Sequence, residues 1–107
     1  MRSITVQELK AALDAGEVGE GDGPLLVDVR EEWEFAQGRV PGARLVPMMT
    51  VPGVAGELPT DRPVYLVCAV GARSGQAAEY LSRLGVDAVN IEGGTAEWVR
   101  AGYPVER

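Results

Sequence analysis

The chain has 107 residues, enough for one hydrophobic core and too few for two, so we expect one domain over residues 1–107. Sixteen acidic and ten basic residues give a net charge of −6, and the basic residues are scattered, which argues against a nucleic-acid surface. The chain has no histidine and one cysteine, which excludes histidine-dependent triads and argues against a metal site.

The single cysteine also bears on location, because no internal disulfide can form and a free thiol suits a reducing compartment. Residues 1–4 start no apolar signal region, and no stretch approaches the length of a membrane span. We therefore expect a cytoplasmic protein with no membrane partner and no cofactor.

The first helix is expected to begin at Thr5, because Thr5 and Glu8 have the spacing of a capping box. It should end at Gly16. Residues 16–24 combine four glycines with acidic residues, a composition that predicts an exposed connecting loop.

The next stretch, residues 25–30, is too apolar for an edge strand and predicts a central, parallel strand. Asp28 and Arg30 lie at its carboxyl end, where ligands gather in open α/β sheets. We expect these two side chains to support the site as structural partners rather than to act as catalysts.

A short helix is predicted over residues 31–37, with Trp33 and Phe35 as packing residues. A turn at 39–43 should lead into a short strand that ends at Val46. Residues 47–59 are predicted to be irregular, with Met48 and Met49 filling gaps in the core.

The most informative stretch begins at Val64–Val67, a β-branched and aromatic run that predicts a buried strand. Cys68 follows directly, and a loop of small residues comes next. A helix is predicted after the loop, with Ala77, Ala78, Leu81 and Leu84 on one face and Gly85 at its end. The thiol is therefore expected where a strand passes into a helix, with free backbone N–H groups around it.

The last elements are a short strand over residues 87–91, a turn at Gly93-Gly94, and a final helix that Thr95 is expected to cap. Strands and helices thus alternate along the chain. That alternation predicts an α/β fold with a mainly parallel sheet.

The position of Cys68 favours a nucleophilic thiolate. Free amides, a helix N-terminus and a nearby cation each stabilise the charged sulfur, and this loop offers all three. The alternative is that Cys68 is a small buried hydrophobic residue, as most lone cysteines are. The residues expected to surround the sulfur and bind substrate are Ala69, Val70, Gly71, Ala72, Arg73 and Ser74.

Arg73 has two interpretations: it either attracts an anionic substrate or packs to stabilise the loop. Ser74 is expected to be a helix-start residue rather than a second nucleophile, because no base is available to activate it.

Four segments together resemble the rhodanese family, the single-domain sulfurtransferases. Three of them are residues 26–31, the turn at 38–43, which carries Arg39 where the family usually has histidine, and the loop from Cys68 to Ser74. The closing segment combines Gly93, Gly94, Trp98, Gly102 and Pro104. The resemblance covers nearly the whole chain, and the segments occur in the family's order.

The resemblance implies a rhodanese-like domain, a sheet with helices on both faces. It also implies that Cys68 takes a sulfane sulfur as a persulfide and passes it to a thiol or to cyanide. The donor is either a small molecule such as thiosulfate or a protein persulfide. Ala69 and Val70 stand where many thiosulfate-using members carry charged or polar residues, so we expect thiosulfate to be captured weakly.

Two other functions stay open. A sulfur carrier or partner-docking module would hold the persulfide for another protein without turning over small molecules. A cysteine phosphatase or arsenate reductase is less favoured, because the six residues from Cys68 to Arg73 have the length of the sulfur-transfer loop and related phosphatases carry one residue more.

Overall fold

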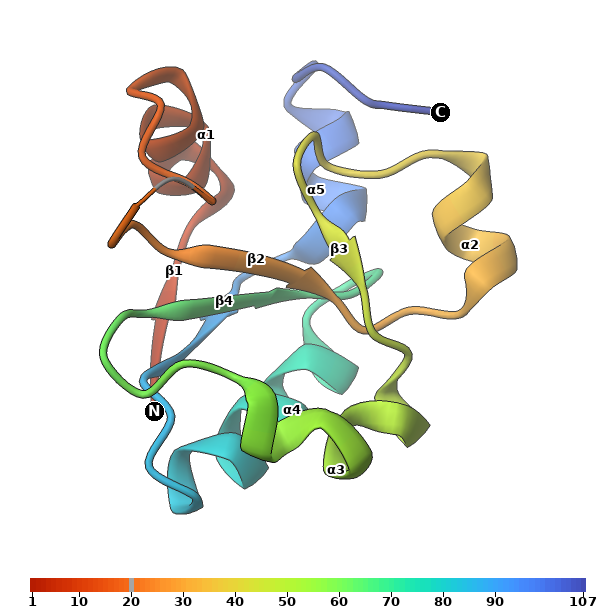
Figure 1. Ribbon diagram of the computed structural model, residues 1–107. Helices are drawn as coiled ribbons and strands as arrows, with labels where there is room; N and C mark the ends of the chain where they lie inside the picture. The colour runs from red at the N-terminus through yellow and green to blue at the C-terminus, as the bar shows by residue number, and fades with distance from the viewer. Residues whose placement is uncertain (20) are drawn as a thin grey trace.

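The computed structural model describes residues 1–19 and 21–107. In this part of the chain, five parallel strands form one sheet in the order β1-β5-β4-β2-β3 (Figure 1). The strands are β1 (Arg2–Ile4), β2 (Leu25–Asp28), β3 (Arg44–Leu45), β4 (Val64–Val67) and β5 (Ala88–Ile91). The predicted α/β class with a mainly parallel sheet is confirmed.

Helices cover both faces of the sheet, because a parallel sheet must bury both of its faces. Figure 1 shows α3 and α4 on one face and α1 and α5 on the other. The helices are α1 (Val6–Asp14), α2 (Glu32–Gln37), α3 (Val51–Val54), α4 (Ala72–Arg83) and α5 (Gly94–Arg100), with two 3-10 turns, η1 (Met48–Thr50) and η2 (Ala55–Glu57).

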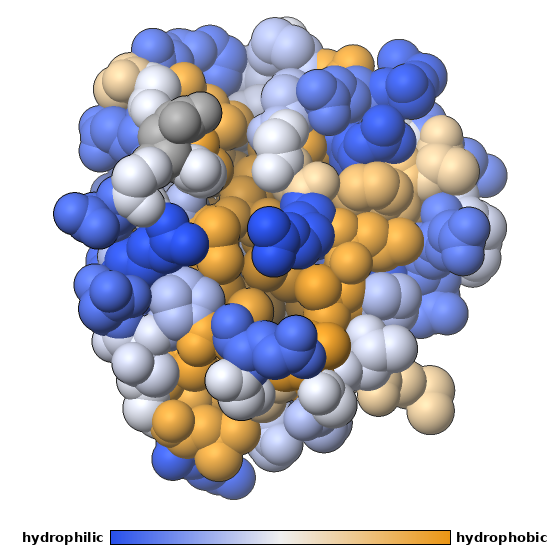
Figure 2. Space-filling view, viewed as in Figure 1, coloured by the Kyte–Doolittle hydropathy of each residue, from blue (hydrophilic) through white to orange (hydrophobic). Residues whose placement is uncertain are grey.

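Two clusters of buried side chains fill the space between the sheet and these helices. The cluster on the α4 side includes Leu66, Ala78, Leu81 and Cys68, so the cysteine closes one end of that core. The cluster on the other side is built around Trp98. At the surface, Figure 2 shows hydrophobic residues across the centre of the viewed face, with hydrophilic residues around and between them.

The predicted start of the first helix is confirmed. The Thr5 hydroxyl accepts the Glu8 N–H, and Glu8 Oε1 accepts the Thr5 N–H, which completes the capping box. The helix ends before Gly16, whose φ of 72° is left-handed. The strand at 25–28 and the strand preceding Cys68 also form as predicted.

The prediction that residues 47–59 are irregular is wrong, since η1, α3 and η2 occupy most of them. Val51 and Ala55 lie four residues apart and are both buried in the α4-side core, which gives the segment one apolar helical face. Met48 packs against this core as predicted, whereas Met49 is exposed. Strand β1 was not predicted, because two exposed residues followed by the half-buried Ile4 carry no strand pattern of their own, and pairing with β5 decides the structure.

Two predicted packing residues are exposed instead. Trp33 of α2 is 64% exposed, and Leu84 lies just beyond the end of α4, outside its buried face. Phe35, the other residue of this helix that was predicted to pack, is half-buried.

The sheet topology fixes where a site can form. Strands β2 and β4 are neighbours in the sheet. From β2 the chain continues to β3 at one edge, and from β4 it continues to β5 in the opposite direction along the strand order. Asp28 and Val67 pair at their carboxyl ends, so Cys68 and the Asp28–Arg30 segment meet at this switch point. None of the described helices is long and apolar enough to span a bilayer.

Candidate active site

Cys68 lies at the junction of β4 and α4 and is only 1% exposed. Two groups donate hydrogen bonds to its sulfur: the Gly71 N–H at 3.0 Å and the Ser74 hydroxyl at 3.2 Å. Gly71 caps α4 with a φ of 101°, a conformation that glycine adopts without strain. This left-handed turn directs the loop amides inward, toward the sulfur.

Two opposing effects set the pKa of the Cys68 thiol. Burial raises it, because a thiolate is poorly solvated there, while hydrogen bonds from the Ser74 hydroxyl and from the amides of Ser74, Gly71 and Val70 lower it. The hydrogen bonds outweigh burial, so the net pKa lies below the ordinary value for cysteine. The loop amides and the helix start thus act on the sulfur as the sequence predicted.

The N-terminus of α5 holds the other side of the loop. The Thr95 N–H and hydroxyl both donate to the Cys68 carbonyl, at 2.8 and 3.1 Å, and the Ala96 N–H donates to the Ala69 carbonyl at 2.9 Å. Thr95 was predicted to cap α5, but Gly93 occupies the cap position. The threonine hydroxyl supports the cysteine backbone instead.

Gly94 makes this approach of α5 feasible. A Cβ atom at Gly94 would lie 2.4 Å from the Cys68 carbonyl oxygen and 2.7 Å from the backbone of Ala69. Only glycine allows the start of α5 to lie so close to the cysteine loop.

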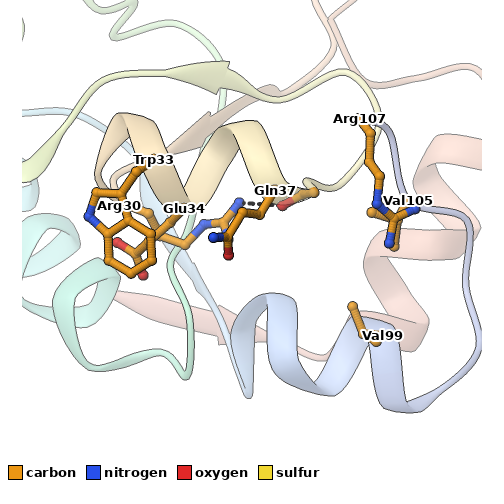
Figure 3. Close-up of a pocket in the computed structure, with 8 residues that line it drawn as sticks. Arg30, Trp33, Glu34, Gln37, Val99, Val105 and Arg107 are labelled. Carbon is orange, nitrogen blue, oxygen red and sulfur yellow. Dashed lines mark hydrogen bonds between the residues drawn. The ribbon is translucent and has the colours of Figure 1, made fainter.

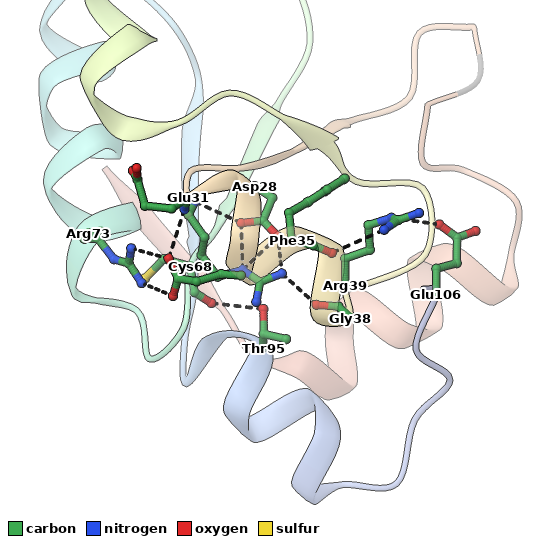
Figure 4. A network of polar contacts seen from close by, with 11 residues as sticks. Asp28, Glu31, Phe35, Gly38, Arg39, Cys68, Arg73, Thr95 and Glu106 are labelled. Carbon is green, nitrogen blue, oxygen red and sulfur yellow. Dashed lines mark hydrogen bonds and ion pairs between the residues drawn. The ribbon is translucent and has the colours of Figure 1, made fainter.

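Asp28 and Arg30 form a buried ion pair beside the loop (Figure 4). Arg30 Nη2 donates to Asp28 Oδ2 and to the Gly38 carbonyl, each at 2.8 Å. Asp28 Oδ1 also accepts the Arg30 N–H at 3.0 Å. The contacts between Asp28 and Arg30 fix the turn after β2, and the contact to Gly38 ties that turn to the end of α2, which is the geometry of structural partners.

The Arg73 guanidinium faces Glu34 of α2 and forms a two-point ion pair, with Nη1–Oε1 at 2.8 Å and Nη2–Oε2 at 2.9 Å. Glu34 Oε1 also accepts the Glu31 N–H at 2.9 Å. The hydrogen bonds from Arg73 lower the pKa of Glu34 from 4.5 to about 2, against the opposing effect of burial. Of the two interpretations of Arg73, this geometry favours stabilisation of the loop.

The side chain of Ser74 is fully buried in the first turn of α4. Its hydroxyl lies 3.2 Å from Cys68 Sγ and 2.6 Å from Asn90 Oδ1 on β5. Ser74 lies in the first turn of α4, where a helix-start residue was expected, and its hydroxyl lies next to the sulfur that it was expected to help surround. The hydrogen bond to Asn90 was not predicted.

Arg39 lies at the opposite end of the polar network from Cys68 (Figure 4). Its guanidinium stacks over the Phe35 ring at 4.5 Å and donates to the Phe35 carbonyl at 3.2 Å. Its backbone pairs with Glu106. Arg39 therefore fastens the C-terminal segment to α2.

A hollow of about 260 Å³ adjoins the site between α2, α5 and the C-terminal segment (Figure 3). It is lined by Arg30, Trp33, Glu34, Gln37, Gly38, Val99, Val105 and Arg107. Glu34 belongs both to this hollow and to the ion pair with Arg73, so the hollow lies beside the cysteine loop. On the loop itself, Val70 is 65% exposed.

The family model described as "Rhodanese-like domain" matches residues 5–101, which is most of the chain. The chain belongs to the rhodanese family. The resemblance noted in the sequence is thereby confirmed.

Several curated relatives of this rhodanese-like domain carry sulfurtransferase names. A protein of Allochromatium vinosum named "Sulfurtransferase" is 45% identical over 82 residues, covering 76% of this chain and 77% of the relative. A protein of Pseudomonas putida named "Thiosulfate sulfurtransferase GlpE" is 35% identical over 91 residues, covering 84% of this chain and 82% of the relative.

Solved structures agree with the fold. A rhodanese-related protein of Thermoplasma volcanium has a TM-score of 0.86 at 32% identity and covers 99% of this chain and 98% of that one. A rhodanese-like domain protein of Staphylococcus aureus has a TM-score of 0.80 at 43% identity, covering 92% and 91%.

Two residues of this candidate site, Glu34 and Asn90, were not predicted from the sequence. Glu34 is one of several acidic residues in a short helix, and only the tertiary fold brings it to Arg73. Asn90 carried a usable signal: it is the only asparagine in the chain and interrupts an apolar strand. A polar residue in such a strand indicates a buried hydrogen-bond partner.

Proposed function

We propose that this protein is a rhodanese-type sulfurtransferase that carries sulfur on Cys68. The observation that carries the proposal is the sulfur's position, 3.0 Å from the Gly71 N–H and 3.2 Å from the Ser74 hydroxyl, at the start of a twelve-residue helix. Donors arranged in this way favour a thiolate, which is the nucleophilic form of cysteine.

In the first half-reaction, the Cys68 thiolate attacks the outer sulfur of a donor such as thiosulfate. A new S–S bond forms on Cys68 while the donor's S–S bond breaks, and the electron pair leaves with sulfite. The persulfide anion carries its charge on the outer sulfur. The amides from Ala69 to Ser74 are proposed to hold this anion, and they need no reorganisation to do so.

In the second half-reaction, an acceptor attacks the outer sulfur. With cyanide, a C–S bond forms, the persulfide S–S bond breaks and its electron pair returns to Cys68 as thiolate, which releases thiocyanate. With a thiol acceptor the product is a persulfide of that thiol. No metal or redox cofactor is needed for either step.

The nature of the donor follows from charge. Arg73 is the cation contributed by the loop, and Glu34 already compensates it at two contacts of 2.8 and 2.9 Å. The chain as a whole carries a net charge of −6. We therefore propose a donor with less negative charge than thiosulfate, such as a protein persulfide, with thiosulfate as a weaker substrate.

The exposed Val70 beside Cys68 supports a second candidate, a sulfur carrier that receives its sulfur from and delivers it to other proteins. An exposed apolar side chain next to a reactive sulfur suits contact with a protein surface. With one free cysteine to keep reduced, either function fits the cytoplasm.

Steady-state turnover separates these functions. We expect thiocyanate from thiosulfate and cyanide, with a high KM for thiosulfate and complete loss in Cys68→Ser. A carrier would accept one sulfur per chain from a persulfide donor without sustained turnover. Hydrolysis of an aryl phosphate that disappears in Cys68→Ser would instead identify a phosphatase and overturn the proposal.

A further inference from the structure

The Ser74 hydroxyl faces two acceptors but carries a single proton. Its oxygen lies 3.2 Å from Cys68 Sγ and 2.6 Å from Asn90 Oδ1. A hydroxyl can donate only one hydrogen bond at a time. The sulfur and the asparagine therefore compete for the same proton.

The orientation of the Asn90 amide is fixed by a third group. Asn90 Nδ2 donates to the Gly71 carbonyl at 3.3 Å, which leaves Oδ1 toward Ser74. If the amide were reversed, Oδ1 would face the Gly71 carbonyl, and two acceptors would meet without a proton between them. The loop that carries Cys68 thus determines that Asn90 presents an acceptor to Ser74.

We infer that Asn90 is a positioning residue that withholds the Ser74 proton from Cys68 and so sets how readily the thiol ionises. In the thiol state, the Cys68 S–H donates to Ser74 Oγ, and the Ser74 O–H donates to Asn90 Oδ1. In the thiolate state, the S–H proton has left to water and the Ser74 O–H turns to the sulfur. Asn90 Oδ1 then faces an oxygen that offers it no proton.

The cost of that second arrangement falls on the thiolate. Two oxygens at 2.6 Å without a proton between them repel each other, so Ser74 or Asn90 must shift when the sulfur ionises. Asn90 therefore opposes the effect of the loop amides, which favour the thiolate. This balance also suits sulfur loading, because the charge then moves to the outer sulfur and the Ser74 proton can return to Asn90.

Other charged groups near the sulfur stay constant in this scheme. Arg73 of α4 is paired with Glu34 of α2, and Asp28 with Arg30 at the end of β2. Glu34 has a pKa of about 2, so it stays ionised across the range in which a thiol titrates. Changes at Asn90 leave both ion pairs in place.

The inference rests on the proposed function only in that Cys68 reacts as a thiolate. Its test is the rate of alkylation by iodoacetamide as a function of pH, which needs no sulfur transfer. Cys68 is the only cysteine in the chain, so every alkylation event reports on it. Failure of sulfur loading with intact titration behaviour would count against the proposed function alone.

The decisive variant is Asn90→Leu, whose side chain is similar in shape but apolar and somewhat larger. It removes the competing acceptor and, with it, the Nδ2 donor to the Gly71 carbonyl. We expect its alkylation midpoint to fall by about 0.4 to 1 pH unit, the equivalent of one hydrogen bond. Ser74→Ala should raise the midpoint. In the double variant, Asn90→Leu should add nothing to the effect of Ser74→Ala, since no hydroxyl is left to compete for.

A merely structural Asn90 gives the opposite sign. If Asn90 only holds Ser74 in place, Asn90→Leu frees the serine to rotate away, and the midpoint rises toward that of Ser74→Ala. A rise or an unchanged midpoint overturns the inference. Should Asn90→Leu fail to fold, Asn90→Ala is expected to shift the midpoint downward and is judged by the same criterion.

Discussion

The N-termini of two helices, α4 and α5, lie next to the cysteine loop, and their backbone N–H groups have different acceptors. Helices α4 and α5 each follow a strand and a left-handed glycine, Gly71 or Gly93, at the cap position. At α4 the amides point at the Cys68 sulfur. At α5 the amides of Thr95 and Ala96 are hydrogen-bonded to the loop's own carbonyls.

This difference distinguishes a helix end that can take part in the reaction from a helix end that only supports the loop. A helix N-terminus has unpaired N–H groups that need acceptors. At α5 the acceptors are backbone carbonyls, so this end of the helix holds the loop in shape. At α4 the acceptor is a side chain that can gain charge, so this end can stabilise an anion. The loop between Cys68 and Gly71 belongs to both arrangements.

The largest effect is expected from breaking the support at α5. Gly94→Ala places a methyl group 2.4 Å from the Cys68 carbonyl and adds backbone strain at a φ of 59°, at a cost of about 2 to 4 kcal/mol. Displacement of the loop should also reduce sulfur transfer at least tenfold, because it moves the amides that face the sulfur. Urea denaturation and turnover measure the two effects.

Gly102→Ala is the matched control, since Gly102 follows α5 with a φ of 80° and open space around it. We expect it to cost about 1 kcal/mol from strain alone and to leave turnover unchanged. Equal losses of turnover in the two variants would mean that the close approach of α5 to the loop is unimportant.

The next largest effect is expected for the ion pair between Arg73 and Glu34, which joins α4 to α2. Glu34 has a folded pKa of about 2, below its ordinary value of 4.5, so its contribution to stability is present above pH 4.5 and is lost as the pH falls toward 2. Glu34→Gln should therefore cost about 1 to 2 kcal/mol at pH 7, allowing for the partial exposure of Arg73.

The difference between Glu34→Gln and the parent protein should shrink between pH 4.5 and 2, as urea denaturation at several pH values would reveal. A constant difference across this range would show that the variant disturbs packing rather than the ion pair.

A smaller effect is expected at Thr95. Thr95→Val removes the hydroxyl donor to the Cys68 carbonyl but keeps the backbone donor, so we expect a loss of about 1 kcal/mol in the free energy of unfolding. Thr95→Ser retains the hydroxyl and should stay close to the parent. A stability loss in Thr95→Val no larger than in Thr95→Ser would contradict a stabilising role for the hydroxyl's hydrogen bond.

The smallest effect tests the charge at the loop. Val70 is exposed beside Cys68, and Val70→Arg adds a cation that no carboxylate already compensates. We expect kcat/KM for thiosulfate to rise by a few-fold to tenfold, the worth of about 1 kcal/mol for a partly exposed charge, and to rise most at low salt. Val70→Gln is the uncharged control, and an equal gain there would contradict an electrostatic cause.

The sequence predicted the parts of the fold that follow from local patterns. Apolar runs marked β2 and β4, the capping box at Thr5 marked α1, and the helical spacing after Cys68 marked α4. The short helical turns of residues 48–57 were missed because a single apolar pair at helical spacing, Val51 and Ala55, is a weak local pattern, and burial of this pair in the core shared with α4 stabilises the turns.

The part of the site that is contiguous in the sequence was predictable, whereas the contacts between residues distant in the sequence were not. Cys68, its loop amides and the start of α4 are contiguous in sequence. The Arg73–Glu34 ion pair and the Ser74–Asn90 hydrogen bond join residues 39 and 16 positions apart, respectively. Such pairs follow from the sheet order and from helix placement, which a single sequence does not specify.

The most direct test of the account is the intact mass of the protein after brief exposure to a sulfane-sulfur donor. We predict a gain of one sulfur atom per chain on Cys68, its removal by cyanide or a thiol, and no gain in Cys68→Ser. Thiosulfate and a persulfide donor should be compared at equal concentration, with faster loading from the persulfide. No gain from any donor, or an equal gain in Cys68→Ser, would contradict the claim that this cysteine carries transferable sulfur.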